Sequence, residues 1–390
     1  MLFRSLLIPT EHTELKIRLG SLSHNITALQ PWFRFQIDLT AETEDWELEF
    51  EVDRWNHHKA EIAEGDSRAL SLLFEKLHFL RSLASKEIVR KRFSKPCLYP
   101  FYRMELESSD FSPCCRWWVE KLPPLKAGED PWNSEAAREL RKSILDGSFR
   151  YCKTDICTPQ FSSGPTASRL GDFLENQDIP LSVESVPPLH FTFTADPRCN
   201  LSCPSCRSKP ITTINDKETK NLSENDQYLD RHRRNLKVLT MATNGEVFYS
   251  PYLRKKLSEA TRENYPSLEG IEIVSNGLLC NERSWQELRP GTDNIRWVRI
   301  SVDAGDSTDY GKVRGGNWNQ LQANLQWLKA LRHQKRIERF SLNFVVQKDN
   351  LNSLKSFFQM ASELEADEIF LSPLLDWPHM KTSQMEISEF

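Results

Sequence analysis

A group of three closely spaced cysteines is the feature of this sequence with the clearest chemistry. Cys199, Cys203 and Cys206 stand in one short stretch, with three and then two residues between them. Soft thiolate ligands suit iron–sulfur clusters, and three thiolates on a four-iron cluster leave one iron open for a substrate or cofactor. A zinc site that borrows a fourth ligand is the alternative, but no further Cys or His follows at a close spacing. The spacing therefore favours a catalytic cluster over a structural metal site.

The three cysteines lie at the start of a repeating strand–helix pattern. We predict strands at His190–Thr194, Lys237–Met241, Gly270–Ser275, Ile295–Val302, Arg339–Val346 and Glu368–Pro373. Helical patterns lie between them at Ser223–Asn235, Pro251–Asn264, Glu282–Leu288, Trp318–His333 and Leu351–Leu364. Strands that alternate with helices indicate a parallel α/β sheet with right-handed crossovers. The pattern fits an open doubly wound sheet or a partial barrel, and a chain that stops after the sixth strand favours the partial barrel.

The cysteine loop itself is similar to a known signature. The pattern Cys199-x-x-x-Cys203-x-x-Cys206, directly after the first strand of a βα repeat, resembles that of the radical S-adenosylmethionine (SAM) superfamily. The resemblance implies a partial (β/α)6 barrel and a 4Fe–4S cluster whose open iron binds the amino and carboxylate groups of SAM. It also implies reductive cleavage to a 5′-deoxyadenosyl radical, hydrogen abstraction from a substrate, and a flavodoxin- or ferredoxin-type reductant. Ser205 departs from the pattern, because an aromatic residue usually precedes the third cysteine.

Residues at the ends of later strands match further positions of the superfamily. The resemblance assigns the cofactor contacts to Gly245, Glu246, Asn276, Ser301, Asp303 and Asn343. Gly245-Glu246 is similar to the Gly-Gly-Glu motif, in which a carboxylate accepts a hydrogen bond from the methionine ammonium group. Arg314 is a further candidate for the same mouth of the barrel. Each position is equally compatible with ordinary turn chemistry, but all lie at strand carboxyl ends, the catalytic face of a βα barrel.

A second block of cysteines precedes the barrel. Cys97, the adjacent pair Cys114-Cys115, Cys152 and Cys157 resemble the ligands of a SPASM/twitch module, which binds an auxiliary iron–sulfur cluster. The resemblance implies one auxiliary 4Fe–4S cluster held by Cys97, Cys114, Cys152 and Cys157. The sequence does not decide between Cys114 and Cys115, and a zinc site is the alternative for the block. In the superfamily this module normally follows the barrel, whereas here it comes first.

The expected organisation is an N-terminal α+β extension, a small cysteine-rich module, a linker and the barrel. We place their boundaries at 1–90, 91–160, 161–188 and 189–390. Within the extension we predict strands at Trp32–Leu39 and Trp46–Val52 and an amphipathic helix at Ser67–Leu83. Within the module we predict a helix at Ser134–Asp146, capped by Ser134 and ended by Gly147. The extension contains no chemistry that we can name, and either docking or a structural role fits it.

The composition of the chain excludes several classes of protein. The 390 residues carry a formal net charge of −4, which gives no general attraction to nucleic acid. No apolar run is long enough to span a membrane, and the first residues do not resemble a secretory signal. Nine cysteines in a long chain without a signal do not suit a secreted disulfide framework. We therefore expect a cytoplasmic protein whose cysteines bind metal.

Three functions remain open at this point. The first is a radical SAM oxidoreductase or maturase that modifies a peptide or protein. The second is a twitch-type dehydrogenase or epimerase of a small polyol or sugar. The third, a non-catalytic iron–sulfur or zinc protein, explains the cysteines but not Gly245-Glu246 or the βα pattern. Cys280 is either a small buried hydrophobic residue or a hydrogen-atom donor, as an epimerase requires.

Overall fold

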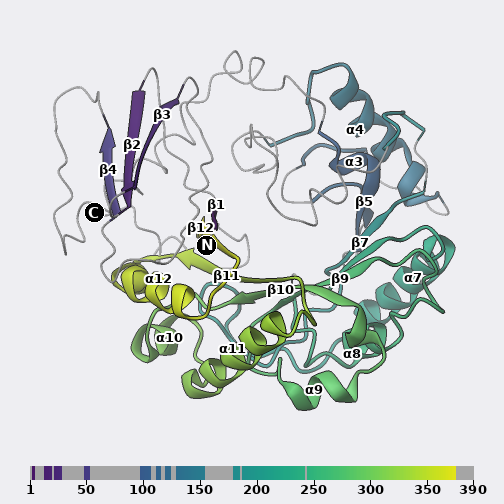
Figure 1. The fold of residues 1–390 in the computed structure, drawn as a ribbon. Helices are drawn as coiled ribbons and strands as arrows, with labels where there is room; N and C mark the ends of the chain where they lie inside the picture. Colours follow the sequence, from purple (N-terminus) through teal and green to yellow (C-terminus); the bar gives the residue numbers. More distant parts are fainter. Residues whose placement is uncertain are drawn as a thin grey trace.

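The fold is a curved α/β sheet with a cysteine-rich segment at one edge and a small separate sheet (Figure 1). The computed structural model describes residues 2–4, 13–19, 22–28, 48–52, 97–106, 111–115, 119–123, 129–153, 179–184, 187–241 and 244–374. Most of the expected linker 161–188, the predicted strand Trp32–Leu39 and the predicted helix Ser67–Leu83 lie outside these residues.

The main sheet contains the six strands that the sequence predicts. These are β7 (His190–Phe193), β8 (Val238–Met241), β9 (Gly270–Ser275), β10 (Ile295–Ser301), β11 (Arg339–Val346) and β12 (Glu368–Pro373). Each strand lies parallel to its successor along the chain. Parallel neighbours in sequence order, joined by helices on one side, form the wall of an open βα barrel. The predicted partial (β/α)6 barrel is confirmed.

Helices cover the outer, convex face of the curved sheet (Figure 1). They are α7 (Asp216–His232), α8 (Pro251–Ser258), α9 (Glu282–Glu287), α10 (Ser307–Val313), α11 (Trp318–His333) and α12 (Leu354–Glu363), with short 3-10 turns η3 (Gly291–Asn294) and η4 (Lys348–Ser353). Alternate strand residues pack against them as the main hydrophobic core, such as Phe191, Phe193, Ile271 and Ile273. Among the described residues, no helix is both long and apolar enough to cross a membrane.

Helices α7, α8 and α10 differ from what the sequence predicts, each for a local reason. Helix α7 begins at Asp216 rather than Ser223, because Asn215 and Glu218 form a capping box in which each side chain bonds the other's backbone N–H. Helix α8 ends at Ser258, and Asn264 Nδ2 donates to the carbonyl of Glu259 just beyond its end. Helix α10 was not predicted, because seven residues give too little periodicity to detect.

The cysteine-rich segment is joined to the barrel sheet. Its elements are α3 (Tyr99–Tyr102), β5 (Arg103–Leu106), β6 (Phe111–Ser112), η2 (Pro131–Asn133) and α4 (Glu135–Leu145). Strand β5 lies parallel to β7 and extends the sheet, and β6 is antiparallel to β5. The edge of β7 is thereby covered, as an exposed edge would otherwise invite pairing with another chain. Helix α4 is capped by Ser134 and followed by Gly147 at positive φ, so this predicted helix is confirmed.

The described N-terminal residues form strands only. Strand β1 (Leu2–Arg4) pairs in parallel with β12 at the other edge of the main sheet. Strands β2 (Thr13–Leu19), β3 (Leu22–Ala28) and β4 (Leu48–Val52) form a separate antiparallel sheet in the order β3-β2-β4. Strand β4 coincides with most of the predicted strand Trp46–Val52.

Candidate active site

The three motif cysteines lie in the loop that leaves the carboxyl end of β7. Cys199 and Cys203 are buried and Cys206 is half-buried. The Cys199 N–H donates to the carbonyl of Ile211 at 2.9 Å, and the Cys206 N–H donates to the carbonyl of Cys203 at 2.8 Å. Burial raises the pKa of the Cys199 thiol. The loop is therefore held by its own backbone around the three sulfur atoms.

Each of the three sulfur atoms lies close to nitrogen donors of the protein. Arg207 donates to Cys206 Sγ from Nε at 3.4 Å and from Nη2 at 3.3 Å. Arg314 Nη1 lies 3.7 Å from Cys203 Sγ. Cys199 Sγ accepts from the backbone N–H of Leu201 at 3.5 Å and lies 3.8 Å from Asn276 Nδ2. Donors and positive charge favour thiolate over thiol and surround the sulfur ligands of iron–sulfur clusters.

A buried carboxylate fixes the start of the cysteine loop. Asp196 is 1% exposed and forms an ion pair with Arg198 through two Arg nitrogens, the shorter N–O distance being 2.6 Å. Ser250 Oγ, at the start of α8, donates to the same carboxylate. An aspartate in this position links the loop after β7 to the loop after β8.

Gly245 lets those two loops approach each other closely. A Cβ at this position would lie 2.2 Å from the carbonyl oxygen of Asp196 and 2.8 Å from that of Arg198. The next residue, Glu246, donates its backbone N–H to the Arg198 carbonyl at 2.9 Å. The glycine is needed for close backbone packing, since both clashing atoms belong to the main chain.

The carboxylate of Glu246 connects the second and third strand ends. It is 1% exposed and accepts hydrogen bonds from Ser275 Oγ at 2.8 Å, from the Asn276 N–H at 2.8 Å and from the Phe248 N–H at 3.2 Å. Burial raises the pKa of Glu246, although these donors oppose the shift. Asn276 in turn donates from Nδ2 to Asn200 Oδ1 in the cysteine loop at 2.9 Å.

A third buried carboxylate, Asp303, lies at the ends of β10 and β11. Asp303 has a positive φ of 57°, accepts from the Val345 N–H at 2.8 Å and pairs with Arg314 Nη2 at 2.6 Å. Burial raises the pKa of Asp303, and the Arg314 charge opposes that shift. On β11, Asn343 has a buried Oδ1 that has no hydrogen-bond partner among the described residues. Ser301 ends β10 beside Asn343 in the strand register and is half-buried.

These contacts bring the predicted barrel residues into one continuous site. The cysteine loop touches the Gly245-Glu246 loop and Asn276, while Arg314 joins Cys203 to Asp303. Three thiol groups that face N–H donors, at the carboxyl ends of parallel strands, form a donor set that fits a 4Fe–4S cluster with three protein ligands. In the part of the chain that the structure describes, no three Cys, His, Asp or Glu side chains are grouped to hold a single metal ion.

The comparison with known families agrees with this geometry. The sequence model of the Radical SAM superfamily matches residues 196–361, from the buried aspartate of the cysteine loop to helix α12. The resemblance to the radical SAM superfamily is thus shown for this part of the chain. Members of this superfamily are enzymes that use a 4Fe–4S cluster and SAM, so the match supports the predictions of an enzyme and of these two cofactors.

The individual proteins that match this chain share little sequence identity with it. The AdoMet-dependent heme synthase of Methanosarcina barkeri (strain Fusaro / DSM 804) is 25% identical over 172 residues, which cover 43% of this chain and 45% of the relative. The chain thus matches less than half the length of this curated relative. Among solved structures, Streptococcus suis SuiB bound to S-adenosylmethionine has a TM-score of 0.38 at 14% identity, with 62% of this chain and 52% of that chain covered. The structure of anSMEcpe with bound AdoMet has a TM-score of 0.36 at 19% identity, with 49% of this chain and 52% of that chain covered.

The cysteine-rich block lies away from the catalytic loop and is described only in part. Cys97 and Cys152 pack against the buried cluster around Phe101 and Tyr102, and Cys114 and Cys152 share a second small cluster. Cys157 lies outside the described residues.

Cys280 lies on the segment after β9 and is fully buried in the main hydrophobic core. Burial raises the pKa of its thiol well above the usual range. Its role as a hydrogen-atom donor stays a prediction.

Sequence reasoning missed Arg207, whose side chain contacts one of the motif cysteines. Arg207 directly follows Cys206, and besides Cys206 Sγ its guanidinium bonds the carbonyls of Pro197 and Asn244, each at 2.5 Å. The signal was present as a basic residue next to the third cysteine. Arg314, which the sequence suggests as a residue at the mouth of the barrel, lies beside Cys203.

Proposed function

We propose that this chain reductively cleaves SAM to a 5′-deoxyadenosyl radical, which abstracts hydrogen from a peptide or protein substrate. The observation that carries the proposal is the set of N–H donors directed at Cys199, Cys203 and Cys206, at the carboxyl edge of the barrel. When bound, the cluster supplies one electron and an open iron for the methionine end of SAM. The protein holds the loop, excludes water and places polar groups around it.

The individual roles follow from the contacts. The three cysteines are the proposed ligands, and Arg207 and Arg314 neutralise the charge on their sulfur atoms. Glu246 orders the turn at Asn276 through two hydrogen bonds, and Gly245 allows the close packing of the loops. Ser301, Asp303 and Asn343 lie on β10, directly after it and on β11, and are the proposed contacts to SAM. Of these, the unpartnered Asn343 Oδ1 is the acceptor best suited to a ribose hydroxyl.

An auxiliary 4Fe–4S cluster is part of the proposal. Its proposed ligands are Cys97, Cys114, Cys152 and Cys157. Support comes from the first three, which gather around α3 and the bridge between Val119 and Cys152. Tyr99, at the start of α3, is electrostatically coupled to both Cys97 and Cys114. A flavodoxin- or ferredoxin-type reductant and a reducing, cytoplasmic location complete the proposal, because clusters of this kind need unoxidised thiolates.

The proposal is tested by product analysis after anaerobic reconstitution with iron and sulfide. Wild-type protein with SAM and a chemical reductant is expected to release 5′-deoxyadenosine and methionine, and Cys203→Ala to release neither. Arg283→Gln, on the exposed surface of α9, is the control and should match the wild type. Stoichiometric zinc in the purified protein, with no SAM cleavage after reconstitution, would contradict the proposal. Reaction in deuterated buffer then separates epimerisation, which introduces solvent deuterium, from a two-electron oxidation.

A further inference from the structure

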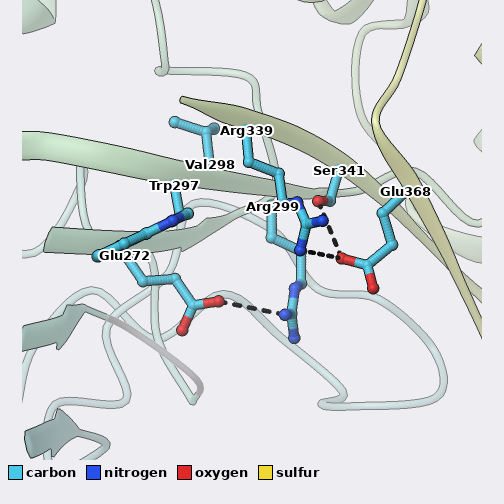
Figure 2. A pocket seen from close by; sticks show the side chains of 7 residues that line it. All are labelled: Glu272, Trp297, Val298, Arg299, Arg339, Ser341 and Glu368. Carbon is cyan, nitrogen blue, oxygen red and sulfur yellow. Dashed lines mark hydrogen bonds and ion pairs between the residues drawn. The ribbon is translucent and has the colours of Figure 1, made fainter. Parts of the chain in front are cut away.

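A narrow pocket lies on the inner, concave face of the sheet, away from the cysteine loop. Four neighbouring strands, β9 to β12, contribute its walls (Figure 2). Its lining residues are Glu272, Trp297, Val298, Arg299, Arg339, Ser341 and Glu368. We call this site the inner-face pocket. It contrasts with the outer face of the same strands, where aliphatic and aromatic side chains pack under the helices.

The charged groups of the inner-face pocket balance one another. Arg299 Nη2 lies 3.1 Å from Glu272 Oε1, and Arg339 Nη1 lies 3.6 Å from Glu368 Oε2. Ser341 Oγ donates to the same Glu368 oxygen at 3.4 Å. Two guanidinium groups therefore face two carboxylates, and the pocket carries no net formal charge.

Two donors in this pocket have no acceptor among the residues that the structure describes. They are the buried indole Nε1 of Trp297 and the buried Nε of Arg299. Trp297 as a whole is 7% exposed, and Figure 2 shows the nitrogen-bearing edge of its ring turned toward the arginines. A buried donor without a partner costs about 1–3 kcal/mol. The described lining residues thus balance in charge and offer two N–H donors to a bound oxygen.

The inner-face pocket lies between the cysteine-rich segment and the catalytic edge. The ring of Trp297 packs in the same buried cluster as Phe101 and Tyr102 of α3. Along β10, Ser301 follows Trp297 by four residues, or about 13 Å of strand. An extended peptide would therefore need about four residues to reach from the pocket to the catalytic end of the barrel.

We propose that the inner-face pocket binds an uncharged carbonyl oxygen of the substrate, such as a backbone carbonyl of a peptide, through Trp297 Nε1–H and Arg299 Nε–H. The inference rests on the proposed function in that the substrate is taken to be a peptide. A carbonyl oxygen has two lone pairs and accepts from both donors at once. A carboxylate would add an uncompensated negative charge beside Glu272 and Glu368, and burying such a charge is costly.

The test is a titration of the reconstituted protein labelled with 5-fluorotryptophan and followed by fluorine NMR. The Trp297 resonance is identified by its loss in Trp297→Phe. Two probes differ only in charge: N-acetylglycine N-methylamide is neutral, and N-acetylglycine carries a carboxylate. We expect a saturable shift of the Trp297 resonance with the neutral probe and a dissociation constant about tenfold weaker or more for the charged probe. A stronger shift with the carboxylate, or no saturable shift with either probe, would overturn the proposal.

A substitution separates the donor from the charge. Arg299→Lys keeps a cation beside Glu272 but removes the Nε donor, and it is expected to weaken the neutral probe about tenfold, equivalent to 1.4 kcal/mol. Unchanged affinity in this variant would contradict the role of Nε. Arg283→Gln is the matched surface control. SAM cleavage without substrate is measured in parallel, so that loss of probe binding with intact cleavage contradicts only this inference, and loss of cleavage with intact binding contradicts only the proposed function.

Discussion

The two cysteine groups of this chain differ in their surroundings. The catalytic loop has three closely spaced cysteines, whose sulfur atoms face N–H groups of Arg207, Arg314 and Leu201. The cysteine-rich segment gathers Cys97, Cys114 and Cys152 from separate elements against apolar and aromatic side chains. The first site is built by polar contacts between strand ends, and the second by packing at the edge of the same sheet.

The difference shows what each site requires from the fold. Parallel strands bring their carboxyl ends to one edge, so that short loops after β7, β8 and β9 interlock through Asp196, Gly245 and Glu246. Chemistry at that edge depends on a few buried polar contacts. Residues of the cysteine-rich segment reach the barrel through β5 and the inner face instead, and their arrangement depends on the packing around Phe101 and Tyr102.

The largest expected effect separates the two cysteine groups directly. Reconstituted wild type is expected to hold about eight iron atoms in two clusters. Cys199→Ala should lose about half of the iron and all SAM cleavage, whereas Cys97→Ala should lose the other half and retain cleavage without substrate. Iron and sulfide analysis with a 5′-deoxyadenosine assay checks both. An equal loss of cleavage in the two variants would remove the functional distinction between the sites.

The close packing of the catalytic loops gives the next effect. Gly245→Ala places a methyl group against the carbonyls of Asp196 and Arg198, and we expect a loss of about 1–3 kcal/mol in the free energy of unfolding. Gly311→Ala is the matched control, because a Cβ there meets no described atom from outside its own stretch of helix within 4 Å, and alanine favours the surrounding helix α10. Denaturant unfolding measures both variants. Equal stability of the two would show that the loops separate at little cost.

The pH dependence of stability probes the opposite end of the barrel. His190, at the start of β7, stacks on Tyr102 and bonds Thr240 Oγ1 at 2.8 Å. Burial lowers the pKa of His190 well below its usual value. As pH falls below about 6.5, His190 binds a proton in the unfolded chain but not in the folded chain. The free energy of unfolding therefore decreases by up to about 1.4 kcal/mol per pH unit.

The contribution of His190 to the pH dependence of stability is obtained by comparing the wild type with His190→Asn. Between pH 7 and 5, His190→Asn should lose stability less steeply than the wild type, while Arg283→Gln, on the exposed surface of α9, should follow the wild type. Urea unfolding at several pH values measures the slopes. Parallel slopes for wild type and His190→Asn would mean that His190 takes up its proton in the folded chain.

The smallest effect concerns the reduction potential of the catalytic cluster. Arg207→Gln removes a positive charge beside Cys206 Sγ, and less positive surroundings disfavour the added electron. We expect the midpoint potential to fall by an amount on the order of 40 mV, with Arg283→Gln unchanged. An EPR-monitored redox titration checks this. A potential that stays constant or rises would show that Arg207 only anchors the loop.

The barrel could be predicted from the sequence because its strands and helices carry different periods. Strands β9, β11 and β12 and helix α11 have the predicted bounds. The start of α7 was missed because a local capping box extends a polar, weakly periodic segment. The polar inner face was also missed: Thr240, Glu272 and Arg299 alternate with apolar residues, but periodicity does not tell which long-range partners satisfy them.

The catalytic site was predictable where residues are close in sequence and was not where they meet through the fold. The spacing from Cys199 to Cys206 is visible in the chain. The hydrogen bonds from Ser275 and the Asn276 N–H to Glu246 depend on the register of separate strands. The joint contact of Arg314 with Cys203 and Asp303 likewise depends on where helix α10 ends.

The central claim is that Cys199, Cys203 and Cys206 hold a four-iron cluster with one iron open to SAM. The most direct test is the EPR spectrum of the reduced, reconstituted Cys97→Ala protein, recorded with and without SAM. We predict a reduced 4Fe–4S signal whose g-values change when SAM is added, because the methionine end of SAM binds the open iron. A reduced cluster signal that SAM leaves unchanged would contradict the account.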